Sequence, residues 1–262
     1  MAFKLTEENR CCTRRLENIG LALLVLRDCV QLYGNILLGR SRLDLKVFVD
    51  DLREAGLSIL FRLTVVAIIV GLVIGVQTEN VLGEVNVPGL LLGSVGLAII
   101  KHFAPLLVGL FVAGRSGIAL AVRIGSMVLN READGLIVNG INPIHYTVGP
   151  MLLAMLLMSF ALAVWTDLIV LATAALWLWL QAGIPWSLFQ DSLRDMLDAG
   201  DLLISVVKPL VFALLVALIA AVNGCRVSRE VESVSRAASR TMISAIAAMQ
   251  LANLLFVFAF AG

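Results

Sequence analysis

The sequence predicts an all-α integral membrane protein with five transmembrane helices, an N-terminal interfacial amphipathic helix, a short cytoplasmic helix and a short periplasmic helix. Of the 262 residues, 60% are hydrophobic and only 15% are charged, whereas a soluble domain is about 25% charged. The mean hydropathy is +0.97, and apolar runs long enough to cross the hydrocarbon recur along the chain. The formal net charge of +1 excludes a nucleic-acid partner recognised by bulk positive charge. We therefore expect one membrane-embedded domain over residues 1–262.

The N-terminal region, residues 14–40, has the heptad pattern of one amphipathic helix. Its a and d positions hold Leu16, Ile19, Leu23, Leu26, Val30, Tyr33 and Leu37. In so hydrophobic a chain, this pattern favours a helix lying in the headgroup plane. Packing against a partner helix is the alternative that the regular heptad leaves open. The residues before it have charges of both signs and no apolar run, which argues against a cleaved signal peptide.

Five segments are predicted to cross the membrane. The first, 57–76, has a single charge, Arg62, near its beginning, where the side chain can extend to the interface. The second, 87–127, is too long for one straight crossing, and Pro105 predicts a break or kink within it. The third, 146–182, is predicted to be one long helix, tilted or bent. The last two are 202–222 and 241–261.

The distribution of Lys and Arg orients these helices. The N-terminal region and the connections 115–142 and 223–240 are rich in arginine, whereas 77–88 and 183–201 together contain only Arg194. With five crossings, this pattern predicts a cytoplasmic N-terminus and a periplasmic C-terminus. The segment 183–201 contains four aspartates and begins with a Pro-Trp pair, which is typical of a short amphipathic helix outside the bilayer core.

The stretch from Phe111 to Pro143 links the second crossing to the third. It contains closely spaced glycines, leaves its apolar phase at about Asn130, and continues as a short polar-apolar segment, 131–140. Gly140, with Pro143 soon after it, is typical of the end of a helix. We expect a short helix lying across the cytoplasmic membrane face, where a partner protein can push it.

This stretch resembles the signature of the MlaE-like (YrbE-like) permease family, the membrane subunits of lipid ABC transporters that work with MCE proteins. The resemblance depends on AGRSG, GSM, ADGL and NGINPIHY, which follow the family pattern without a gap. Weaker similarity extends from about Gly56 to the C-terminus. Asp134, Gly140 and Pro143 keep the family pattern, whereas Arg123 stands where the family has a glutamate.

The resemblance implies the permease subunit of an ATP-driven phospholipid transporter in a bacterial inner membrane, concerned with outer-membrane lipid asymmetry. It implies a homodimer, a lipid substrate, cytoplasmic ABC ATPase subunits, a periplasmic MCE-domain protein and a small STAS-type accessory subunit. The chain has no Gly-Lys pair and hence no phosphate-binding loop for ATP. We therefore expect no cofactor in this chain and no enzyme activity of its own, with ATP and Mg²⁺ bound by the partner ATPase.

The ionisable residues inside the predicted spans are the candidate substrate contacts, because such groups are costly in a membrane and face an interior, a cavity or each other. Lys101 and Lys208 can attract an anionic headgroup. The resemblance implies that the region of Lys101, His102 and Pro105 lines the lipid cavity and that Lys208 belongs to it. Pairing of either lysine with Asp167 is the alternative, and a structural role is the favoured interpretation of Asp167.

Two further groups complete the candidate residues. The resemblance implies that helix 131–140 couples the chain to the ATPase, and its candidate contacts are Arg131, Glu132, Asp134, Leu136 and Gly140. Close helix packing, within one subunit or across a dimer axis, is expected at Gly114, Gly117 and Gly125.

Two rival functions use the same residues. One is an intramembrane lipid-modifying enzyme that uses His102 and Asp167, and the other is an ion-coupled secondary transporter with either residue as proton carrier. The sequence has neither an obvious inverted repeat nor a catalytic constellation. With two histidines in the chain, we expect no multi-histidine metal site.

Overall fold

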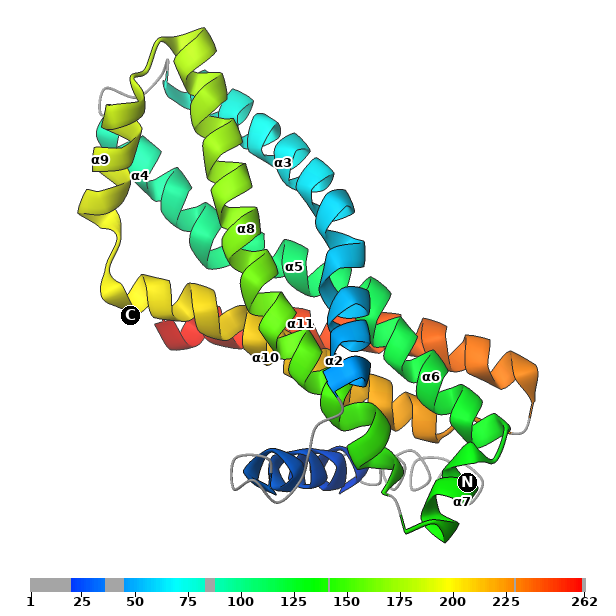
Figure 1. The fold of residues 1–262 in the computed structure, drawn as a ribbon. Helices are drawn as coiled ribbons and strands as arrows, with labels where there is room; N and C mark the ends of the chain where they lie inside the picture. The colour runs from blue at the N-terminus through cyan, green and yellow to red at the C-terminus, as the bar shows by residue number, and fades with distance from the viewer. Residues whose placement is uncertain (1–19, 36–44, 83–87, 141, 229, 261–262) are drawn as a thin grey trace, which may run out of the picture. The chain divides into compact units, whose positions relative to one another are not determined.

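The computed structural model describes residues 20–35, 45–82, 88–140, 142–228 and 230–260, and all regular structure within these ranges is helical. Five helical runs are long and apolar enough to cross a membrane (Figure 1). They are Lys46–Leu82, Gly89–Leu129, Ile144–Ala182, Gly200–Cys225 and Val231–Ala259. For the described residues, the prediction of an all-helical protein with five helices long and apolar enough to cross a membrane is therefore confirmed.

The described residues pack as two compact units, and each is treated by itself. Unit 1 consists of 1–51, 113–154 and 214–250, and unit 2 of 52–112, 155–213 and 251–262. The N-terminal helix occupies 20–35. The helices α2 (Leu45–Leu52) and α3 (Ser58–Leu82) form the first run, with a π-helical turn, η1 (Arg53–Leu57), between them.

The second run shows how the long segment around Pro105 stays helical. Its parts are α4 (Pro88–Ala98), η2 (Ile99–Phe103), α5 (Ala104–Val112), η3 (Ala113–Gly117) and α6 (Ile118–Leu129). The break or kink expected near Pro105 takes the form of the π-helical turn η2, which ends directly before α5. Because a π turn shifts the hydrogen-bond register by one residue, it accommodates an irregularity without ending the helix.

The remaining elements follow in chain order. They are α7 (Glu132–Val138), η4 (Ile144–Val148), α8 (Gly149–Ala182), α9 (Trp186–Met196), α10 (Ala199–Cys225) and α11 (Val231–Phe260). The helix α8 is unbroken over 34 residues. At about 1.5 Å per residue, α8 is longer than the hydrocarbon is thick.

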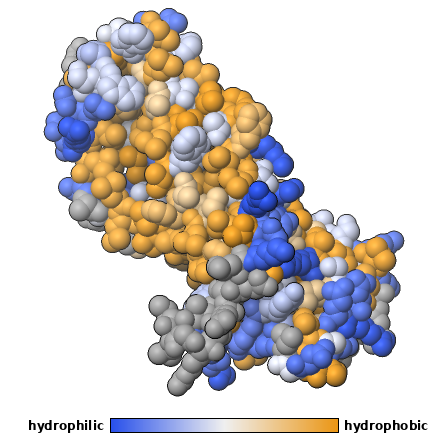
Figure 2. Space-filling view, in the orientation of Figure 1, coloured by the Kyte–Doolittle hydropathy of each residue, from blue (hydrophilic) through white to orange (hydrophobic). Residues whose placement is uncertain are grey.

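Small residues set the packing of unit 2. Gly71 and Gly75 of α3 lie directly against Val170, Thr173 and Trp177 of α8, so that a Cβ on either glycine would overlap its neighbours. Helices in a membrane associate through such close contacts because lipid removes the hydrophobic drive between them. On the outer face of α3 and α8, large apolar side chains stay exposed, and Figure 2 shows a largely apolar surface on the side of these helices in view.

The amphipathic helix α9 packs along α4 within unit 2 (Figure 1). Phe189 of α9 is buried with Leu92 of α4 and Leu178 of α8. Gly93 of α4 lies against Ser192 and Met196 of α9. Part of the apolar side of α9 is therefore covered by protein, while Trp186 and Leu188 stay exposed.

In unit 1, the N-terminal helix buries Val25 and Cys29 and leaves Leu23 and Val30 exposed. Tyr33 Oη donates a hydrogen bond to the Gly149 carbonyl at 2.8 Å. Neither buried residue is an a or d position of the expected heptad, whose described members Leu26 and Tyr33 are only partly buried. The ends of the expected helix, 14–19 and 36–40, lie outside the described residues.

Candidate functional site

The centre of the candidate site is Lys208, which α10 places inside unit 2 with only 1% of its surface exposed. Its Nζ donates a hydrogen bond to the Lys101 carbonyl at 2.8 Å and lies 3.3 Å from His102 Nδ1. The Phe256 ring of α11 has its centroid 5.8 Å from Nζ. Within the described residues these contacts include no carboxylate, so Lys208 adds a positive charge that no neighbouring anion neutralises.

Pro105 explains why a lysine can bond to the backbone here. In an α-helix the amide of residue 105 would donate to the carbonyl of residue 101, four positions earlier. Proline has no amide hydrogen, and its ring interferes with that same carbonyl. The Lys101 carbonyl, at the π turn η2, therefore lacks this α-helical donor, and it accepts a hydrogen bond from Lys208. The sequence-predicted residues Lys101, His102, Pro105 and Lys208 are brought together by this arrangement.

Lys101 directs its own ammonium elsewhere, to the carboxylate of Asp201 at the start of α10. The alternative of a pair with Asp167 is not what the structure has for Lys101, which binds Asp201, and Lys208 bonds to the carbonyl and imidazole described above. Asp167 lies in α8, and its buried Oδ1 has no hydrogen-bond partner among the described residues. Asp201 is thus a site residue that the sequence reasoning assigned only to the acidic periplasmic segment.

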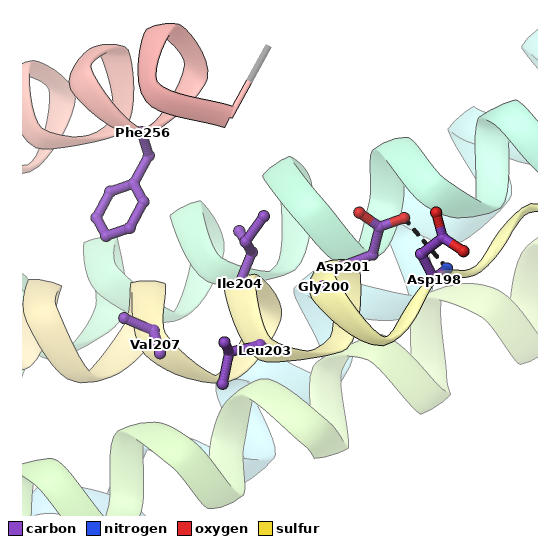
Figure 3. Close-up of a pocket in the computed structure, with 7 residues that line it drawn as sticks. All are labelled: Asp198, Gly200, Asp201, Leu203, Ile204, Val207 and Phe256. Atoms are coloured by element: carbon purple, nitrogen blue, oxygen red, sulfur yellow. Dashed lines mark hydrogen bonds between the residues drawn. The ribbon is translucent and has the colours of Figure 1, made fainter. Parts of the chain in front are cut away.

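A cavity of about 570 Å³ opens beside this cluster within unit 2. Figure 3 shows that its walls are amphipathic: the carboxylates of Asp198 and Asp201 lie at one end, while Leu203, Ile204 and Val207 extend from them towards Phe256. Among the described residues that line it, none of the four predicted substrate residues appears. Their partners do, because Asp201 holds Lys101 and Phe256 faces Lys208.

The short helix α7 is fully or partly exposed along its whole length and buries no residue in this chain. Asp134 is exposed, and Ile137 and Val138 expose 61% and 86% of their surfaces. The helix is bounded by two residues with left-handed backbone conformation, Arg131 (φ 58°) and Gly140 (φ 74°). These two positions reverse the chain on either side of α7, so that it projects from α6 and η4 as a separate turn of helix.

The predicted packing glycines differ in their surroundings. Gly125 lies against Val227, and a Cβ there would come within 2.8 Å of the valine side chain. Gly117 is buried in η3. Gly114 has room within the chain, because the nearest atom to a Cβ built there is Met242 Cε at 4.0 Å. Packing inside this subunit therefore requires a glycine at position 125 but not at position 114.

Sequence reasoning missed a buried ion pair in unit 1. Arg123 of α6 binds Asp51 of α2 at 2.6 Å, and the Asp51 side chain is only 3% exposed. Arg123 was noted only as a departure from the family pattern, and the pair is 72 residues apart in sequence. The signal available was an acidic pair, Asp50-Asp51, shortly before the first predicted crossing.

Comparisons with known proteins agree on one family. The family model described as Permease MlaE matches residues 48–259. The chain is 25% identical over 206 residues to the "Intermembrane phospholipid transport system permease protein MlaE" of Haemophilus influenzae, covering 76% of this chain and 77% of that protein. It is 26% identical over 164 residues to a probable ABC transporter permease protein of Synechocystis, covering 62% and 61% of the two chains.

A plant relative extends the comparison. The chain is 25% identical over 161 residues to "Protein TRIGALACTOSYLDIACYLGLYCEROL 1, chloroplastic" of Arabidopsis thaliana. The match covers 62% of this chain and 46% of the plant protein.

Proposed function

Because the chain belongs to the MlaE permease family, we propose that it is the membrane subunit of an ATP-driven transporter that moves phospholipid between the inner membrane and the periplasm or outer membrane. The printed description of the Haemophilus influenzae relative supports phospholipid as the cargo. The observation that carries the proposal is the buried ammonium of Lys208, held without a carboxylate beside an amphipathic cavity.

The cavity suits a lipid because its two ends differ in the way that a lipid's two ends do. A headgroup phosphate would compete with Asp201 for Lys101 and gain from the positive charge of Lys208 behind it. Asp198 and Asp201 would then accept a cationic part of the same headgroup. The apolar wall from Leu203 to Phe256 would take the beginning of an acyl chain. A zwitterionic phospholipid is therefore the substrate class that fits best.

The chain would receive its energy through α7. A partner ATPase binding there would cover Ile137 and Val138, which this chain leaves exposed, and would meet the carboxylates of Glu132 and Asp134. Both acids lie in the first turn of α7, where they favour the helix through its dipole. Closure of the ATPase would push α7 and, through the helices that continue from it, change the width of the lipid cavity.

The expected assembly contains two copies of this chain, two cytoplasmic ATPase subunits, a periplasmic MCE-domain protein and a small STAS-type subunit. The arginine-rich connections favour an orientation with α7 and the N-terminus in the cytoplasm and the C-terminus in the periplasm. ATP and Mg²⁺ would bind to the ATPase and not to this chain.

Proteoliposomes containing the chain with its copurifying ATPase and MCE partner test the substrate site. Lys101→Met should slow ATP-dependent transfer of fluorescent phospholipid by roughly tenfold, since loss of a charge-assisted hydrogen bond is worth about 1.5–3 kcal/mol. Arg62→Met is the matched control, because Arg62 is an exposed cation of α3 away from the cavity. Transfer by the chain alone, without nucleotide or with a proton gradient only, would refute the proposal.

The coupling role has its own test in the same assembly. Asp134→Asn should leave the basal ATPase rate intact and abolish most of its stimulation by lipid, because the exposed carboxylate would lose its contact with the ATPase. Asp191→Asn, which removes an exposed carboxylate of α9, should change neither rate. Full lipid stimulation in the Asp134 variant would exclude this carboxylate from coupling.

A further inference from the structure

A second cavity, separate from the lipid cavity, lies in unit 1 where α10 ends and α11 begins. Its volume is about 310 Å³, within the lower range of small-ligand sites. Arginine and small polar side chains make up nearly all of its lining: Asn223, Arg226, Ser228, Ser233, Arg236 and Arg240. The function proposed above uses none of these residues.

Hydrogen bonds within the connection shape this cavity before any ligand binds. Ser233 Oγ donates to the carbonyls of Ser228 and Glu230, at 2.8 and 2.6 Å. Asn223 Nδ2 donates to Thr241 Oγ1 at 3.1 Å and so ties the end of α10 to α11. The arginines therefore start from a fixed backbone, and binding would order only their side chains.

Arg236 and Arg240 are poorly neutralised. The connection 223–240 contains four arginines and two glutamates. Arg236 pairs with Glu230 at 3.0 Å and with Glu232 at 3.8 Å, but these side chains are 55–88% exposed, and such surface pairs contribute little. The Arg240 guanidinium has no hydrogen bond or ion pair to another described residue. Two guanidinium groups are thus available to a stronger anion than a solvated carboxylate.

We propose that this cavity binds a phosphate group, carried by an anionic lipid headgroup or present as free phosphate. Guanidinium groups bind phosphate oxygens in pairs of parallel hydrogen bonds, a geometry that lysine cannot reproduce. The cavity lies where α10 ends and α11 begins, and the ends of membrane-spanning helices meet the headgroup region, where lipid phosphates are found. The arginine-rich character of this connection assigns it to the cytoplasmic leaflet. A phosphate bound there would bridge Arg236 and Arg240 and hold the α10–α11 connection.

The experiment uses the full-length chain, with its assembly partners, in nanodiscs of phosphatidylcholine with or without phosphatidylglycerol. Lipid retained after extraction is counted by native mass spectrometry, and thermal stabilisation by inorganic phosphate is compared with chloride at equal ionic strength. The variants are Arg240→Gln and Arg236→Gln, and Arg62→Gln of α3 is the control. Each pocket variant should weaken binding of the phosphate-bearing ligand roughly tenfold, while the control leaves it unchanged.

The two arms identify the source of the phosphate. Retention of phosphatidylglycerol that is lost in both pocket variants supports the site and names a lipid headgroup as its ligand. Stabilisation by inorganic phosphate alone, lost in the same variants, supports the site with a free anion as its ligand. Equal binding by the wild type and both pocket variants, or equal loss in the Arg62 control, would overturn the proposal.

Discussion

The hydrogen bond between Lys208 and the Lys101 carbonyl makes a prediction that can be measured on the purified chain. Pro105 leaves that carbonyl without its helical donor, and Lys208 supplies the replacement at 2.8 Å. Replacing Pro105 by alanine returns an amide hydrogen to the helix. The carbonyl would then have a backbone partner, and the lysine would no longer be needed to satisfy it.

A double-mutant cycle isolates this effect. Lys208→Met alone removes a hydrogen bond to a charged donor, worth about 1.5–3 kcal/mol, but it also removes the cost of burying an ammonium. The single variant is therefore a poor test. In the Pro105→Ala background the cost of burying the ammonium persists and the contribution of the hydrogen bond disappears, so Lys208→Met should be less destabilising there by about 1.5–3 kcal/mol.

Thermal unfolding in one detergent, followed by tryptophan fluorescence, measures the four proteins of the cycle. For a chain of this size the coupling corresponds to a difference of about 3–6 °C in Tm. Pro185→Ala is the matched control, since Pro185 is an exposed proline before α9 and its effect should add to that of Lys208→Met. If the effects of Pro105→Ala and Lys208→Met are also additive within about 0.5 kcal/mol, the explanation of this hydrogen bond is wrong.

Three other predictions concern unit 1. Arg123→Ala should destabilise the chain by about 3 kcal/mol in the same thermal assay, because the buried Asp51 carboxylate loses its guanidinium, and the loss should shrink when Asp51→Asn is added. Gly140→Ala should destabilise the end of α7 by about 1–2 kcal/mol, because Gly140 has a left-handed φ of 74°. Gly135→Ala, inside α7, should stabilise that helix by up to about 1 kcal/mol. The rate of amide hydrogen exchange in α7 should therefore rise in the first variant and fall in the second. Burial, with a smaller contribution from Asp28, raises the pKa of the Cys29 thiol to about 11. In a chain whose other cysteines are replaced by serine, alkylation of Cys29 should therefore be slow at pH 8 and become faster as the pH approaches 11. At pH 8 it should be fast only after denaturation.

Most of the membrane architecture could be predicted because hydropathy and helix-ending signals are local. An apolar run longer than about 20 residues must satisfy its backbone internally, whatever its neighbours are. Gly140 was identified as a helix end from its position before Pro143, and the structure gives it the left-handed conformation that glycine adopts most easily. Pro105 likewise predicted an irregularity, although a π turn and not a break accommodates it.

The contacts of the site required the tertiary structure. Lys101 and Asp201 are 100 positions apart, and Arg123 and Asp51 are 72; no local pattern relates them. Whether Lys208 faces the protein or the lipid depends on the rotation of α10 about its axis, and the π turn η2 shifts the rotation of the residues that follow it in its own helical run. Composition and periodicity therefore determined that this chain is a five-helix membrane protein with charges inside its spans. Only the packed helices decided which charge is neutralised and which one stays available, because that depends on distances between groups far apart in the chain.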